Sequence, residues 1–185
     1  DTEDVPVANP SFEFPVQAFA PFFTIGVADG WLVGGGAGVW DPTTYGLING
    51  GQVTGSQVAF ANSDSLRQVL DHTLLPLARY TVSVDVIYRT DVTPFDYRVA
   101  LLAGTDPYVD GITDWDGFTT ITTLAEATSG SHGTPAPGDA LTVTFSFDTD
   151  WSTPELGQTL AILLESDGIQ TDFDNVRVSV EPLPS

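Results

Sequence analysis

The sequence predicts an all-β protein built from two packed antiparallel sheets, with roughly eight to ten short strands. Segments in which apolar and polar residues alternate recur along the chain, and such alternation is typical of strands with one buried face. No segment has a long helical pattern with caps at both ends, and glycine-rich turns separate the alternating segments. Together these observations exclude a mainly helical fold.

The alternation places the individual strands. Residues 79–89 form the clearest strand, because Tyr80 and Val82 share one face while Thr81 and Ser83 share the other. Further strands are predicted at residues 57–61, 65–70, 97–103, 118–124, 141–148, 158–165 and 172–180, with one more at 11–16 and one near Trp31. Loops are predicted at residues 34–36, 49–51, 110–117 and 129–138, and residues 63–71 fit either a short helix or an edge strand.

Length and composition restrict the class of protein. The 185 residues suit a single domain, 1–185, because no linker divides them. The 25 acidic and 5 basic side chains give a net charge of −20, which excludes nucleic acid as a partner and favours cations. No apolar run reaches the length of a bilayer span, so no membrane insertion is expected. Cysteine is absent, and the chain begins at Asp1 without Met, so we expect a processed protein located outside the cell or on its surface.

Two acidic segments at opposite ends of the chain point to a metal ion. If residues 171–180 form one strand, Asp172 and Asp174 share a face with Val176, at the end of its apolar stripe. Burying these carboxylates unpaired costs roughly several kcal/mol. Glu13 lies between two aromatic residues near the start of the chain. A calcium ion that bridges Glu13 and Asp174, with backbone oxygens as further ligands, would neutralise both; the alternative is that both acids are hydrated at the rim of the sheets.

Several short motifs resemble one known family when taken in order. These are NPSFE, GAGVWDP, GSQVAF, SLRQVL, RYTVSVDV, DYRVALLAG, LGQTLAILL and TDFDNVRVSV, and together they extend over roughly residues 7–180. In this order they resemble a secreted bacterial jelly-roll family that is related to carbohydrate-binding modules and includes the calcium-dependent Stig cyclases of indole-alkaloid biosynthesis. The resemblance implies a jelly-roll β-sandwich with a structural calcium ion joining Glu13 to Asp174. The ending EPLPS also resembles the start of a PEP-CTERM sorting tail.

Catalytic patterns are weak in the residues themselves. His72 and His132 lack metal-ligand spacing, and no GxSxG elbow is present. Asp172 with Asp174 or Glu165 could form a glycosidase pair, although acids beside a calcium ion are more often ligands.

The resemblance to the cyclases implies a more specific site. It places an acid, Asp172 or Asp174, and an aromatic residue, Tyr97, in a pocket between the sheets. Phe60 stands where we would align a tyrosine, which removes a hydroxyl group able to relay a proton. Tyr97 and Phe60 could also simply belong to the core.

The loop at residues 108–117 combines aromatic and acidic side chains. Tyr108 and Trp115 could stack on a sugar ring, and Asp110, Asp114 and Asp116 could hold a second calcium ion. The alternative is a solvated acidic loop with the tryptophan folded onto the body of the protein.

These observations favour a non-catalytic role. We expect a calcium-stabilised surface or matrix protein that self-associates through its terminal strands, as in a filament, or binds polysaccharide. The alternative is a Stig-like calcium-dependent cyclase that acts on an isoprenoid-indole substrate. The cyclase requires an apolar pocket of a few hundred Å³ that contains Asp172 or Asp174.

Overall fold

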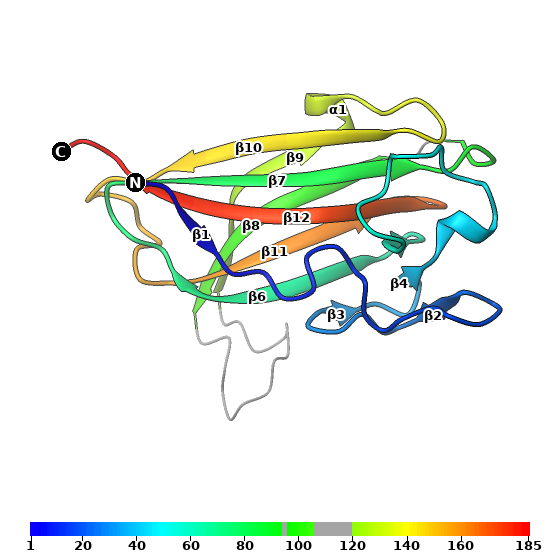
Figure 1. Ribbon diagram of the computed structural model, residues 1–185. Coiled ribbons are helices and arrows are strands. Elements are labelled where there is room, and N and C mark those ends of the chain that lie inside the picture. Colours follow the sequence, from blue (N-terminus) through cyan, green and yellow to red (C-terminus); the bar gives the residue numbers. More distant parts are fainter. Residues whose placement is uncertain (94–95, 106–119) are drawn as a thin grey trace.

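The computed structural model describes residues 1–93, 96–105 and 120–185, which fold into two facing antiparallel sheets (Figure 1). The larger sheet has the strand order β10 (Ala140–Asp148), β7 (Ala78–Tyr88), β12 (Thr171–Pro182), β5 (Val58–Ala61), β4 (Ala37–Trp40) and β2 (Phe23–Ile25), and β1 (Glu3–Val5) also pairs with β12. The smaller sheet has the order β3 (Leu32–Val33), β6 (Ser65–Thr73), β11 (Thr159–Ser166), β8 (Tyr97–Thr105) and β9 (Thr120–Thr128). This arrangement confirms the predicted all-β jelly-roll sandwich.

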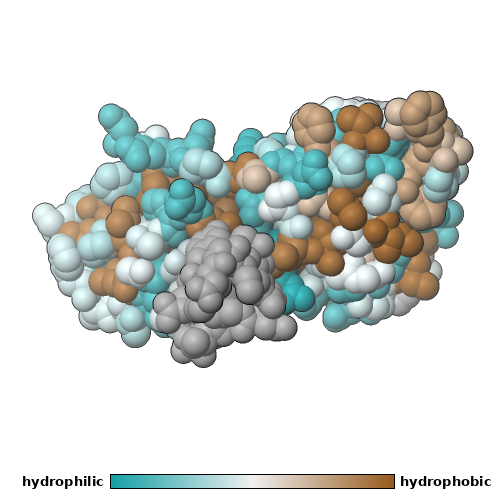
Figure 2. All heavy atoms as spheres, turned by 90° about the horizontal axis from the view of Figure 1, so that it is seen from below, coloured by the Kyte–Doolittle hydropathy of each residue, from teal (hydrophilic) through white to brown (hydrophobic). Residues whose placement is uncertain are grey.

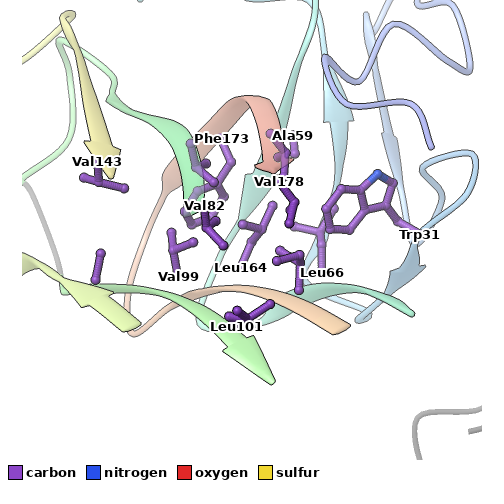
Figure 3. Packing of buried hydrophobic residues seen from close by; sticks show 14 of the residues in the cluster. Trp31, Ala59, Leu66, Val82, Val99, Leu101, Val143, Leu164, Phe173 and Val178 are labelled. Carbon is purple, nitrogen blue, oxygen red and sulfur yellow. The ribbon is translucent and has the colours of Figure 1, made fainter. Parts of the chain in front are cut away.

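The main hydrophobic core fills the space between the sheets. Strand β7 contributes Val82 from the larger sheet, and β11 contributes Leu164 from the smaller one; neither side chain is exposed to solvent. Figure 3 shows these residues pointing toward one another, with Phe173 and Val99 beside them. The period-two pattern therefore predicted correctly which face of β7 is buried.

Most predicted strands are present, with local differences. Residues 63–71 fall largely in β6, so a strand is correct and the helix is not. The strand lies between β3 and β11 and not at the edge of its sheet. Residues 11–16 form no strand: the chain turns there, with Phe12 at a φ of 55° and its amide bonded to the Asn9 carbonyl at 3.2 Å. Trp31 makes an isolated bridge to Ala28, and β3 follows directly. The loop predicted at 129–138 begins with the short helix α1 (Ser129–His132), which Thr128 caps.

The orientation predicted for the carboxylates of β12 is wrong, because this strand contains a β-bulge. The pairing of β12 with β7 shifts register between Asp174 and Arg177, and Asn175 has a φ of 52°. Phe173 and Val176 both belong to the core, although they are three residues apart. Because neighbouring residues of a strand point to opposite faces, Asp172 and Asp174 lie on the outer face of the sheet, away from the apolar stripe.

The two chain ends pair with each other. Glu3 lies opposite Val180, and Val5 lies opposite Val178, so β1 lies along the far end of β12 (Figure 1). Each terminal strand thus has a partner within its own chain. Within the described residues, no helix is long and apolar enough to cross a membrane.

Candidate functional site

A pocket of about 330 Å³ opens on the outer face of the larger sheet, near the end that carries β2 and β4. It is lined by Phe23, Ile25, Trp40, Tyr45, Leu47, Phe60, Asn62, Arg89 and Gln170. All the strands that line it belong to one sheet, so the prediction of a pocket between the sheets is wrong in its position. Its size and apolar lining agree with the prediction, but neither Asp172 nor Asp174 is among the residues that line it.

The outer face is apolar at this position because loops cover it. In β5, Ala59 points into the main core, while Val58 and Phe60 point outward. These two residues form a second buried cluster with Trp40 from β4 and Ile87 from β7. Leu47, Ile48 and Val53, from the connection between β4 and β5, pack onto this cluster.

The connection after β4 positions the mouth of the pocket. Asp41 accepts a hydrogen bond of 2.9 Å from the Thr43 amide and so caps a 3-10 turn, Pro42–Thr44. Tyr45 follows this turn, and its hydroxyl group donates to the Pro21 carbonyl at 2.6 Å. Its ring lies 6.1 Å from that of Trp40. Tyr45 thereby joins the pocket wall to the N-terminal segment.

Asp172 lies directly behind the pocket wall. Its carboxylate is fully buried, and Oδ1 accepts hydrogen bonds from Trp40 Nε1 at 3.0 Å and from Gln170 Nε2 at 2.7 Å. Within the described part of the chain, Oδ2 has no hydrogen-bond partner. Burial raises the pKa of Asp172 to about 7, although the two hydrogen bonds and the nearby Arg89 act to lower it. The side chain is therefore a weak acid that holds a proton near neutral pH.

Arg89 organises the polar side of the pocket. Its guanidinium group donates to the side-chain oxygen Oε1 of Gln170 at 2.7 Å and forms an ion pair with Asp91 at 2.6 Å. Its central carbon also lies 5.5 Å from the centre of the Trp40 ring, which is a cation–π contact. Sequence reasoning missed Trp40 and Arg89, because only the pairing of distant strands brings them near Asp172. It also missed Gln170, which is two residues from Asp172 in the chain.

Glu13 and Asp174 both bind the loop at residues 54–57. Glu13 Oε1 accepts from the Ser56 and Gln57 amides at 3.0 and 2.9 Å, and Asp174 Oδ2 accepts from the Thr54 amide at 2.6 Å. Burial raises the pKa of Asp174 to about 7, and the negative charges of Asp85 and Glu13 act in the same direction.

The carboxylate pair, Glu13 and Asp174, has no cationic counterpart among the ion pairs of the described residues. The described residues hold no group of three or more His, Cys, Asp or Glu side chains placed to bind a metal ion. An ion at this pair would therefore take its remaining ligands from backbone oxygens and water, which suits calcium. Asp172 shares none of the hydrogen-bond partners of Glu13 or Asp174, and its own partners lie at the pocket.

The other predicted site residues lie elsewhere. Tyr97 belongs to the smaller sheet, where its hydroxyl group donates to the Gly133 carbonyl at 2.7 Å; it does not line the pocket beside Asp172. Glu165 is also on the smaller sheet, in β11. Tyr108, Asp110, Asp114, Trp115 and Asp116 lie outside the described residues.

An exposed apolar segment borders the mouth of the pocket. Residues 14–27 contain no charged side chain, whereas the whole chain has 30. Phe19 is 84% exposed, and the segment also exposes Phe14, Val16, Phe23, Ile25 and Val27. Figure 2 shows apolar side chains gathered at the end of the molecule where β2 and β3 lie.

Comparisons with solved structures relate this fold to cyclases and to sugar-binding modules. The Stig cyclase Fisc from Fischerella sp. TAU, in complex with (3Z)-3-(1-methyl-2-pyrrolidinylidene)-3H-indole, is 26% identical over the whole of both chains, with a TM-score of 0.79. A cyclase from Fischerella sp. TAU in complex with 4-(1H-indol-3-yl)butan-2-one is 25% identical over 99% of this chain and 100% of that one, with a TM-score of 0.69.

The CBM22-1 xylan-binding domain of Paenibacillus barcinonensis Xyn10C is 14% identical over 86% of this chain and 90% of that one. With a TM-score of 0.51, it shows likeness of fold alone. A search of curated proteins found no match. A family model described as HpiC1 cyclase matches residues 3–179, and the chain therefore belongs to the HpiC1-like family.

Proposed function

We propose that this protein is a cyclase that closes a ring in an apolar, indole-bearing substrate, with Asp172 as the proton donor. The single observation that carries this proposal is the position of Asp172, a buried acid directly behind an apolar pocket. The two Fischerella cyclases contain indole ligands, which supports an indole as the substrate class. The comparisons favour this alternative over the non-catalytic surface or matrix protein that the sequence led us to expect.

The carboxyl group of Asp172 suits acid catalysis without a redox cofactor. Its pKa of about 7 leaves a proton on many molecules at neutral pH, and Oδ2 is the oxygen free to carry it. Transfer of this proton to an alkene or ring carbon creates a carbocation, which the π electrons of a second double bond attack to form the new ring bond. Loss of a proton from the product cation returns the proton to Asp172, so the substrate is isomerised and atoms balance.

The pocket wall suits a short-lived cation. Trp40, Phe60 and Tyr45 offer aromatic rings, whose faces attract positive charge. The apolar lining also keeps water away from the cation, and water would otherwise trap it as an alcohol. Gln170 lines the pocket and donates to Asp172, so a rotation of the Gln170 side chain on substrate binding would expose the acid.

We also propose a structural calcium ion at Glu13 and Asp174. The two carboxylates come from opposite ends of the chain, and both bind the loop at residues 54–57, so a cation here would join three segments. The role of the ion is to neutralise this pair and hold the loop. The same connection between β4 and β5 includes Leu47, a residue of the pocket wall, so ordering it would support the pocket.

A direct test compares Asp172→Asn with the wild-type protein on an indole that carries a prenyl-type side chain at carbon 3. We expect the substitution to lower the rate of ring closure at least about a hundredfold, because an amide cannot donate the proton. Asp71→Asn is the matched control, since this aspartate is exposed on β6. Ring closure by Asp172→Asn at the wild-type rate would overturn the proposal.

Three expectations from the sequence stay predictions. They are secretion, self-association and polysaccharide binding. The exposed apolar segment at residues 14–27 supports self-association, because burying it against a second copy would remove apolar surface from water.

A further inference from the structure

The pocket has one polar side, formed where β5, β12 and β7 end. Thr171 pairs with Ala61 on one side and with Tyr88 on the other. The next residues outward along these strands are Gln170, Asn62 and Arg89, and all three line the pocket. We call these three residues the polar row.

Two members of the polar row have their hydrogen-bonding groups already engaged. The Gln170 amide donates to Asp172 and accepts from Arg89, at 2.7 Å in both cases. The Arg89 guanidinium group donates to Gln170 and pairs with Asp91. A ligand that bonded to either residue would have to break one of these contacts.

Asn62 differs from its two neighbours. Its side-chain oxygen is buried and has no hydrogen-bond partner within the described part of the chain. Its backbone is fixed, because the Asn62 amide donates to the Gly36 carbonyl at 2.9 Å and the next amide, of Ser63, donates to the Gly168 carbonyl at 3.0 Å. An unused buried acceptor is unfavourable in a folded protein, and a ligand can supply the donor that it lacks.

The alternation of β5 places Asn62 on the same outward face as Phe60. If the indole ring of a ligand packs against Phe60, the nitrogen at the edge of that ring can therefore face Asn62. Because no donor holds the Asn62 oxygen, the amide plane can turn over about its last side-chain bond and present that oxygen to the pocket.

We propose that Asn62 accepts a hydrogen bond from the ring N–H of the substrate and thereby makes the pocket specific for indoles that are unsubstituted at nitrogen. This inference rests on the proposed function, since it assumes an indole in this pocket. Asn62 is a specificity-determining residue under this proposal. It takes no part in proton transfer, which belongs to Asp172.

The test measures binding by calorimetry and requires no turnover. The probes are 4-(1H-indol-3-yl)butan-2-one and the same ketone methylated on the indole nitrogen. We expect wild-type protein to bind the N–H probe about tenfold more tightly, because the methylated probe cannot donate. In Asn62→Leu the two affinities should agree within about twofold, whereas Asn62→Asp, which keeps an acceptor, should retain the preference. Circular dichroism melting curves verify that both variants are folded.

Three outcomes would overturn the assignment. They are equal affinity of the two probes for wild-type protein, a tenfold preference that persists in Asn62→Leu, and no binding of either probe to wild-type protein. The second outcome would mean that the methyl group is rejected by its size alone.

Asp172→Asn separates this proposal from the proposed function. The variant should keep the tenfold preference for the N–H probe while losing ring closure. Ring closure at the wild-type rate would overturn the role of Asp172 and leave the role of Asn62 standing.

Discussion

The indole nitrogen of Trp40 donates a hydrogen bond of 3.0 Å to Oδ1 of Asp172, although the two residues lie 132 positions apart in the chain. Trp40 also lines the pocket, and the central carbon of the Arg89 guanidinium group lies 5.5 Å from the centre of its ring. One side chain thus contacts the acid, the pocket and the nearest cation. The acid strength of Asp172 depends on this contact, because a hydrogen bond to a carboxylate favours its charged form.

Replacing Trp40 by phenylalanine should therefore make Asp172 a weaker acid. The Trp40→Phe variant keeps an aromatic wall but loses the N–H donor, so we expect the pKa of Asp172 to rise from about 7 by roughly one unit. The basic limb of the pH–rate profile for ring closure should move upward by the same amount. Trp151→Phe is the control, since Trp151 is 74% exposed. If the basic limb of the profile does not move, or moves to lower pH, the assignment of this limb to Asp172 is wrong.

The stability of the calcium-free protein should rise as the solution becomes mildly acidic. Burial raises the pKa of Asp172 and of Asp174 from 3.8 to about 7, so between these two values the folded state binds more protons than the unfolded state. The free energy of unfolding therefore falls as pH increases from about 4 to about 7, and these groups cause no further change above that range.

Urea denaturation in EDTA at pH 5.0 and pH 7.5 measures this effect. We expect greater stability at pH 5.0, and Asp172→Asn should reduce the difference by up to about 2.5 kcal/mol, because the amide has no proton to bind. Equal slopes with pH in the wild type and in this variant would show that Asp172 titrates as an ordinary exposed acid.

Calcium should stabilise the fold through Glu13 and Asp174. An ion that binds only the native state raises the free energy of unfolding by about 2.7 kcal/mol at a hundred times its dissociation constant, which corresponds to a rise in melting temperature of several degrees. Scanning calorimetry with calcium and with EDTA measures the shift, which Glu13→Gln and Asp174→Asn should largely remove. Asp172→Asn should retain it, since that carboxylate bonds to Trp40 and Gln170. An identical melting curve with and without calcium would show that Glu13 and Asp174 do not hold a stabilising calcium ion.

The sequence was sufficient for the elements whose pattern is local. Alternation in β7 and β10 follows from side chains that point to opposite faces, so Val82 and Val143 could be assigned to the core without any tertiary contact. The pair Glu13 and Asp174 could also be anticipated, because two acids among apolar neighbours need a common counter-charge. Both side chains bind the loop at residues 54–57, and their joint role as metal ligands stays a prediction.

The position of the pocket depended on contacts that no single segment encodes. The run Val58 to Ala61 is apolar at every position, so its pattern cannot distinguish a core face from an outer face. Only the covering loop, with Leu47 and Ile48, makes the outer face apolar and able to hold a ligand.

By itself, the sequence determined the sandwich, its strands and the acids that need neutralising, because side-chain period and charge are properties of the chain alone. The tertiary structure decided what Asp172 does. A bulge at Asn175 changes which face of β12 is buried, and strand pairing places Trp40 against Asp172, beside the sequence neighbour Gln170. Hydrogen bonds and burial of this kind exist only once distant strands are side by side, and they are what turn an ordinary aspartate into an acid with a pKa of about 7.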